Sequence, residues 1–202
     1  MVRLEKVKYK PVSARELLIE MKDLSELMID LAYSAALFNS HALAEEVMEM
    51  ESHIDTLTYL LNMNIMIAAR DAEDAESLVG VTKVARATDK ISDAAADIAA
   101  IVLQEIGIHP IIREAFEKVE ERLTRANVKP KSILIGKQIG ELELAARMGV
   151  DIIAIRRNRK WVIDPEEDET IQEGDVLIVR GAPQGIDEIE DVAKGKIQKL
   201  ED

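Results

Sequence analysis

Apolar residues recur with the period of an α-helix through about the first 127 residues of this 202-residue chain. Spacings of three and four residues are typical of helices that bury one face. Ser13 and Glu16 form an S-x-x-E capping box, which predicts the start of the first helix. Breaks at residues 39–40 and 70–74 predict antiparallel helices joined by short turns. The three stripes are Leu17, Met21, Leu24, Met28, Leu31 and Ala35; Leu43, Val47, Met50, Ile54, Leu57 and Leu61; and Leu78, Val81, Ala85, Thr88, Ala95 and Val102.

A shorter charged helix is predicted over residues 111–125, with Pro110 in its first turn. It completes a predicted helical domain over residues 13–127.

The pattern changes after Pro130, where strand-like segments alternate with short helices. This alternation predicts a small α/β or α+β lobe over residues 128–202, and hence a two-domain chain. The predicted segments are an apolar run at 132–135, a helix at 139–148 closed by Gly149, a hairpin of 151–156 and 160–163, a buried strand at 176–179 and a helix at 183–193.

Composition limits the classes of function. The chain has no cysteine, which excludes disulfides and thiolate metal sites, and its net charge of −13 argues against nucleic-acid binding. The N-terminus has no apolar signal segment, and no apolar run has the length of a membrane span. We therefore expect a cytoplasmic protein that reaches the inner face of a membrane only through a partner.

Stacked carboxylates mark the second and third predicted helices. Glu51 and Asp55 are four residues apart, and so are the members of a ladder made by Asp89, Asp93 and Asp97. Like charges at this spacing destabilise a helix. Two interpretations stay open: a solvated acidic face, or a site for a hard cation such as Mg²⁺, Ca²⁺, Mn²⁺ or iron, which prefer oxygen ligands.

The E-x-x-x-D and R-x-x-D-x-x-x-D-x-x-x-D patterns resemble those of the PhoU family over residues 13–105. The resemblance implies a three-helix unit whose motif acids bind a divalent or ferric cation. The implied ligands are Glu51, Asp55, Asp89 and Asp93, with Asp97 as a further candidate. Family members typically have two tandem units, so a metal site completed by a second unit would need another subunit.

Enzyme classes find little support in the sequence. A di-iron site of the ferritin type needs E-x-x-H, and Met50 stands where the acid before His53 is required. No nucleophile–base pair is recognisable, so we predict no catalytic residues.

The C-terminal segment is similar to the TrkA-C domain, the C-lobe of regulators of potassium conductance. The motifs are I-G-E-L at residues 139–142, G-V-x-I-I-A-I-x-R ending at Arg157, and G-D-V-L-I-V-x-G at residues 174–181. The resemblance implies a dimerising lobe of a cytosolic transport regulator. No G-x-G-x-x-G follows a strand, so NAD is not expected.

A basic cluster stands out in this acidic chain, made by Arg156, Arg157, Asn158, Arg159 and Lys160. It is interpreted either as a solvated hairpin tip or as an anion site, because arginine side chains bind phosphate with two parallel hydrogen bonds. Related lobes bind anionic signals, which implies a cyclic dinucleotide between two lobes.

The leading functional hypothesis is a non-enzymatic regulatory subunit of a membrane potassium channel or transporter, acting as a homodimer or larger homo-oligomer. Two alternatives remain: a phosphate-signalling adaptor of the PhoU type, and an enzyme that uses a carboxylate–metal cluster.

Overall fold

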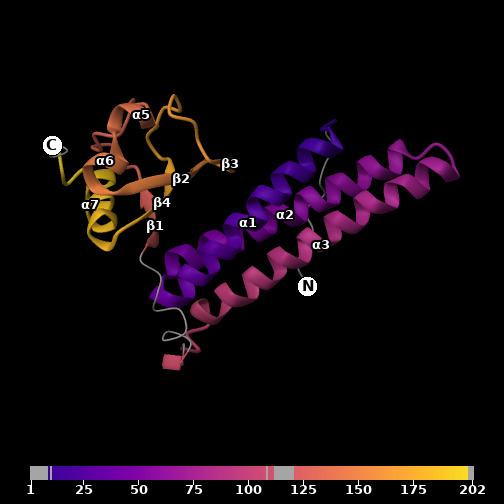
Figure 1. Cartoon of the computed structure of the whole chain (residues 1–202), viewed down its shortest axis with the longest axis horizontal. Helices are drawn as coiled ribbons and strands as arrows, with labels where there is room; N and C mark the ends of the chain where they lie inside the picture. The colour runs from indigo at the N-terminus through magenta and orange to yellow at the C-terminus, as the bar shows by residue number, and fades with distance from the viewer. Residues whose placement is uncertain (1–8, 10, 108, 112–120, 200–202) are drawn as a thin grey trace. The chain divides into compact units, whose positions relative to one another are not determined.

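The computed structural model describes residues 9, 11–107, 109–111 and 121–199. The chain divides into two compact units, Met1–Pro110 and Ile111–Asp202, and each is described by itself. The first is entirely helical in its described part, and the second combines a sheet with short helices (Figure 1).

Three long helices form the first unit: α1 (Ala14–Phe38), α2 (His41–Ala68) and α3 (Ala72–Leu103). Each packs against the other two, so they make a three-helix bundle (Figure 1). Every residue of the first two predicted stripes is buried. In the third stripe Ala85, Ala95 and Val102 are buried, whereas Leu78 and Val81 are only half-buried. The predicted helical bundle is confirmed.

Short polar residues end and start these helices where the sequence predicted breaks. Ser13 and Glu16 form both hydrogen bonds of the capping box. Asn39 ends α1 in the left-handed conformation, and the Ser40 hydroxyl accepts the Leu43 N–H at the start of α2. Asp71 caps α3 in the same way through the Asp74 N–H. These caps satisfy N–H groups that a helix cannot pair internally.

The second unit is built on a four-stranded antiparallel sheet with the order β1-β4-β2-β3. Its strands are β1 (Arg122–Asn127), β2 (Val150–Arg157), β3 (Lys160–Ile163) and β4 (Val176–Gly181). The helices α5 (Ile139–Leu142), α6 (Leu144–Met148) and α7 (Pro183–Ala193) gather on one face (Figure 1). Between sheet and helices lies a core that includes Leu134, Ile155, Ile171, Leu177, Val179 and Ile189.

Two sequence predictions about this region were wrong. Residues 122–125, assigned to the end of a helix, belong to β1, which pairs with β4 from Arg122 opposite Gly181 to Asn127 opposite Val176. The rest of that predicted helix lies largely outside the described residues. Because β1 completes the sheet, the division between the units falls before it, and not at the predicted domain boundary of 127/128.

The second error concerns the helix predicted over residues 139–148. It is split into α5 and α6 because Glu143 takes a left-handed conformation, with φ of 47°. Gly149 does close α6 in that conformation, as predicted. Within the described part of the chain, none of the helices combines enough length with enough apolar character to cross a membrane.

Candidate functional site

The predicted basic cluster lies at the β2–β3 hairpin, where Arg157 pairs with Lys160 and the two-residue tip is Asn158–Arg159. Asn158 has φ of 59°, a left-handed conformation that asparagine adopts more readily than most residues. Asn158, Arg159 and Lys160 are exposed. The tip therefore presents cationic side chains to solvent, as both sequence interpretations require.

Arg156 and Trp161 are paired across the hairpin and so lie on the same face of the sheet. The guanidinium carbon of Arg156 is 5.9 Å from the centre of the indole ring, within the range of a cation–π contact. One guanidinium nitrogen also donates to the Asn158 carbonyl over 3.4 Å. These contacts hold the guanidinium group near the indole face while leaving both residues partly accessible.

Arg157 has a different role from its four neighbours. Its Nε and Nη2 donate to the two carboxylate oxygens of Asp175 over 2.8 Å each, Nη1 donates to Glu169 over 2.9 Å, and Nη2 also donates to the Thr170 carbonyl. Asp175 is 1% exposed and also accepts the Gln172 N–H. These hydrogen bonds raise the pKa of the Arg157 guanidinium, chiefly through Asp175. The side chain ties the loop after β3 to the end of β2.

The sheet face opposite the helices carries a second arginine that the sequence analysis missed. We call this face the outer sheet face and define it by Arg125, Ala154, Arg156, Trp161 and Ile178, of which Ala154 and Ile178 are fully buried. The strand registers pair Arg125 with Ile178, Ile178 with Ala154, and Arg156 with Trp161. An irregularity between Ile152 and Ala154 places Arg156 on this face and Ile155 in the core. Arg125 was not found because residues 122–125 were assigned to a helix.

The predicted acidic residues come together between α2 and α3. Burial, followed by the charge of Asp55 and the charges of Asp93 and Asp89, raises the pKa of Glu51. The pKa of Asp55 is raised by burial and by Asp89 and Asp93. The Thr58 hydroxyl donates to Asp89 over 3.0 Å. The structure thus brings four of the five predicted acids within electrostatic reach, and Asp97 lies one further turn along α3.

This acidic cluster does not by itself have the geometry of a metal centre. Across the described residues, the His, Asp and Glu side chains form no group of three or more that could hold a metal ion. The neighbouring carboxylates raise the pKa of Glu51 and of Asp55, but the acidic side chains do not converge on one point. The metal prediction therefore stays a prediction, and it requires ligands from outside these residues, such as a second copy of the chain.

Two glycines of the C-terminal motifs are explained by close backbone contacts. A Cβ atom at Gly181 would lie 2.5 Å from the Gly149 carbonyl oxygen, so β4 can approach the α6–β2 junction only without a side chain there. Gly140 donates its N–H to the Glu167 carbonyl over 2.8 Å, and a Cβ atom would lie 3.1 Å from the Glu167 Cβ. Gly140 and Gly181 are thus packing positions.

Comparison with known protein families agrees with these two units. Residues 18–102 match the PhoU domain family, and residues 123–194 match the TrkA-C domain family. The chain therefore combines a PhoU domain with a TrkA-C domain, as the resemblances in its sequence predict.

Two curated relatives are potassium transport proteins. Probable potassium channel protein 2 of Methanocaldococcus jannaschii is 25% identical over 150 residues, covering 69% of this chain and 43% of that protein. Ktr system potassium uptake protein C of Bacillus subtilis is 29% identical over 73 residues, covering 36% of this chain and 33% of that protein. The chain thus spans less than half the length of each relative.

Solved structures similar to part of the chain include two C-terminal lobes. The RCK_C domain dimer of S. agalactiae BusR in complex with c-di-AMP is 25% identical, and the match covers 36% of this chain and 95% of that chain with a TM-score of 0.34. The RCK C domain of the potassium transport protein KtrA in complex with c-di-AMP is 24% identical, with coverage of 41% and 94% and the same TM-score of 0.34.

Proposed function

We propose that this chain is a non-enzymatic regulatory subunit of potassium transport. The single observation that carries the proposal is the similarity to a probable potassium channel protein over 69% of the chain. That share is larger than either compact unit alone, so it includes parts of both. The similarity of part of the chain to a second protein, of potassium uptake, is consistent with the same role. The partner would be a membrane channel or transporter, contacted from its cytoplasmic side.

The regulatory signal is proposed to be an anionic ligand that binds at the outer sheet face. Arg156 supplies a cation beside the flat indole of Trp161, and Arg125 lies on the same face two strands away. A cation next to an aromatic ring suits a molecule that carries both phosphate and a stacking base. A cyclic dinucleotide is a molecule of this kind, and it is the ligand that the resemblance to the TrkA-C domain implies.

The outer sheet face also supports a proposal about how two copies of the chain assemble. One hairpin has too few walls to enclose a ligand, since small-molecule sites bury most of the ligand surface. Two copies related by a two-fold axis would present two outer sheet faces to a two-fold symmetric dinucleotide. We therefore propose a homodimer in which the C-terminal units contact each other.

Calorimetric titration of the full chain with cyclic di-adenylate tests the ligand. Charge-assisted hydrogen bonds contribute about 1.5–3 kcal/mol, so R156A is expected to weaken binding about tenfold or more. R147A is the matched control, because Arg147 lies on α6, pairs with Glu143 just before that helix and is not part of the outer sheet face. Absence of heat with the wild-type chain, or equal affinity of R156A and R147A, would contradict the proposed site.

A phosphate-signalling adaptor is the second candidate, favoured by the PhoU match over residues 18–102 alone. The potassium relatives make it the weaker of the two. Co-purification from the native organism separates them: a potassium channel or transporter supports the first, and a phosphate transporter supports the second.

A further inference from the structure

Helix α3 carries a second apolar stripe beside the one that packs in the bundle core. We call it the α3 seam, and its spacings are three, four, three, four and three. The residues are Val84, Ala87, Ile91, Ala94, Ile98 and Ile101. Val84, Ile91 and Ile101 are 56%, 43% and 36% exposed. The bundle core uses a different face of α3, which includes Ala85, Ala95, Ala99 and Val102.

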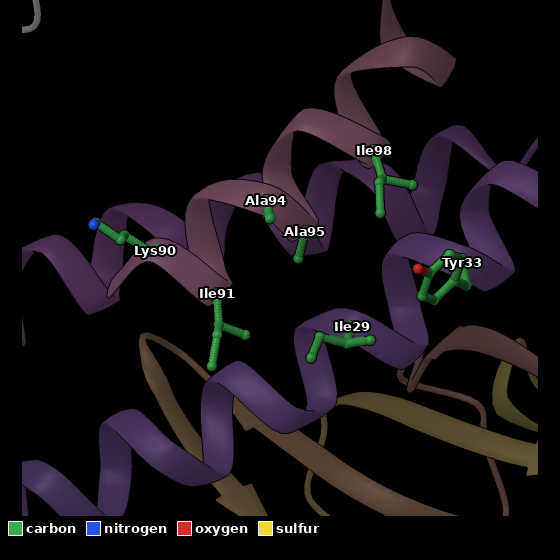
Figure 2. Close-up of a pocket in the computed structure, with 7 residues that line it drawn as sticks. All are labelled: Ile29, Tyr33, Lys90, Ile91, Ala94, Ala95 and Ile98. Carbon is green, nitrogen blue, oxygen red and sulfur yellow. The ribbon is translucent and has the colours of Figure 1, made fainter. Parts of the chain in front are cut away.

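The period of the α3 seam is 3.5 residues, the repeat with which helices pack knobs into holes against another helix. The stripe also borders a groove of about 320 Å³ between α1 and α3. Ile29 and Tyr33 of α1 face Ile91 and Ile98 of α3 across this groove, and Ala94 lies in its wall (Figure 2). The surface is therefore both regular and concave, as a helix-docking surface needs to be.

We propose that the occupant is the α3 seam of a second copy of this chain, packed antiparallel about a two-fold axis near Ser92. In that arrangement Ile91 lies opposite Ala94 of the second copy, and Ala87 lies opposite its Ile98. A large residue meets a small one in each of these layers, which lets the two helices interdigitate. A parallel arrangement would instead place Ile91 opposite Ile91 and leave alanines facing each other.

Charges flanking the α3 seam select the same arrangement. Lys90 and Asp97 directly precede Ile91 and Ile98, so they lie on the same side of the stripe and one heptad apart. Both are exposed, and within the described part of the chain neither forms an ion pair. Antiparallel packing sets Lys90 of each copy against Asp97 of the other, which makes two symmetric pairs. Complementarity to itself in both size and charge identifies the occupant as this same chain.

Charge reversal of the full chain tests the interface without touching any core residue. K90E and D97K each replace two attractions with two repulsions, so each is expected to weaken self-association about tenfold or more in sedimentation experiments. The double variant K90E/D97K should regain wild-type association. An equimolar mixture of the two single variants should also associate, because each supplies the charges that the other lacks. K83E is the matched control: Lys83 occupies the same heptad position but lies opposite Gln104, and we expect little change.

Cysteine cross-linking gives a readout that does not depend on any other contact between chains. The wild-type chain has no cysteine, so an I91C/A94C variant can form only the engineered disulfides. Mild oxidation should give covalent dimers in which position 91 of each copy is joined to position 94 of the other. The control variant E73C/E76C has the same spacing on an exposed part of α3 and should give no such dimers.

Two results would overturn the proposal: equal cross-linking of the two cysteine variants, or cross-linking of I91C/A94C that is unchanged when K90E is added. Both read the α3 contact itself, which the proposed contact between C-terminal units does not mask. Neither experiment involves cyclic di-adenylate, so failure here leaves the ligand proposal standing, and the reverse also holds.

Discussion

The two units treat clustered charge in opposite ways. In the C-terminal unit, the nearly inaccessible Asp175 accepts two hydrogen bonds from Arg157 and one from the Gln172 backbone. In the helical unit, Glu51 and Asp55 lie among further carboxylates, and both have raised pKa values. The first cluster is compensated by Arg157, whereas no described residue forms an ion pair with Glu51 or Asp55.

This difference shows why a charged motif does not by itself indicate a ligand site. Arg157 belongs to the basic cluster by sequence, yet its hydrogen bonds hold a loop in place. An opposite charge supplied by the fold converts a possible binding residue into a structural one. Conversely, an uncompensated carboxylate cluster lowers stability until protons, cations or another chain neutralise it.

The largest expected effect is the loss of the Arg157–Asp175 pair. R157A leaves the Asp175 carboxylate buried without its partner, which is expected to lower the stability of the C-terminal unit by about 3 kcal/mol. R157K should have an intermediate effect, because lysine cannot make the two parallel hydrogen bonds. Urea unfolding followed by Trp161 fluorescence measures this unit selectively, since the chain has one tryptophan.

R159A is the control for that experiment. Arg159 is at the exposed hairpin tip, where substitutions change stability by about 0.5 kcal/mol or less. Equal unfolding midpoints for R157A and R159A would show that the Asp175 pair does not stabilise the unit.

An effect of opposite sign is expected in the helical unit. E51Q/D55N removes two mutually repelling charges, and like-charge pairs cost about 0.2–0.5 kcal/mol each, so stability at neutral pH should rise by up to about 1 kcal/mol. The native chain binds these protons at higher pH than the unfolded chain, so the contribution of Glu51 and Asp55 to stability rises as pH falls through their raised pKa values. The advantage of the variant should therefore disappear in acid.

Circular dichroism of urea unfolding, which reports mainly the long helices, measures this difference as a function of pH. E76Q serves as the control, because Glu76 is exposed near the start of α3. A repeat with millimolar Mn²⁺ separates repulsion from metal binding. Preferential stabilisation of the wild-type chain by Mn²⁺ would support a cation site. Equal stabilisation of the wild-type chain and E51Q/D55N would show that charge repulsion alone accounts for the difference.

How much the sequence could predict depended on whether a pattern was local. The buried stripes of α1 and α2 follow from periodicity, since each residue's face is set by its own helix. The strand β1 could not be recognised in this way, because R-L-T-R-A-N has few apolar residues and gains its place from pairing with β4, which lies far along the chain. Its Thr124 hydroxyl also donates to Glu190 of α7, another distant partner.

Prediction of the candidate site had the same limit. The five residues of the basic cluster were found from their adjacency, but their separation into Arg156 on the outer sheet face and Arg157 in the loop clamp depends on strand register and on the position of Asp175. The irregularity at Ile152–Ala154, which sets those faces, has no distinct sequence signal. The spacing of the acidic residues along each helix could be read from the sequence. The approach of the acids of α2 to those of α3 could not, because it depends on how the two helices pack.

The smallest expected changes in stability concern one asparagine in each unit. Asn39 ends α1 with φ of 50°, and Asn158 forms the hairpin tip with φ of 59°. Alanine disfavours this conformation, so N39A should destabilise the helical unit and N158A the C-terminal unit by about 1 kcal/mol or less. Glycine adopts the conformation freely, so the stabilities of N39G and N158G should stay within a few tenths of a kcal/mol of the wild type.

N158G also tests the predicted ligand role of Asn158, because it keeps the turn and removes the side chain. Unchanged affinity for cyclic di-adenylate would make Asn158 a turn residue, and weaker binding at unchanged stability would make it a ligand contact.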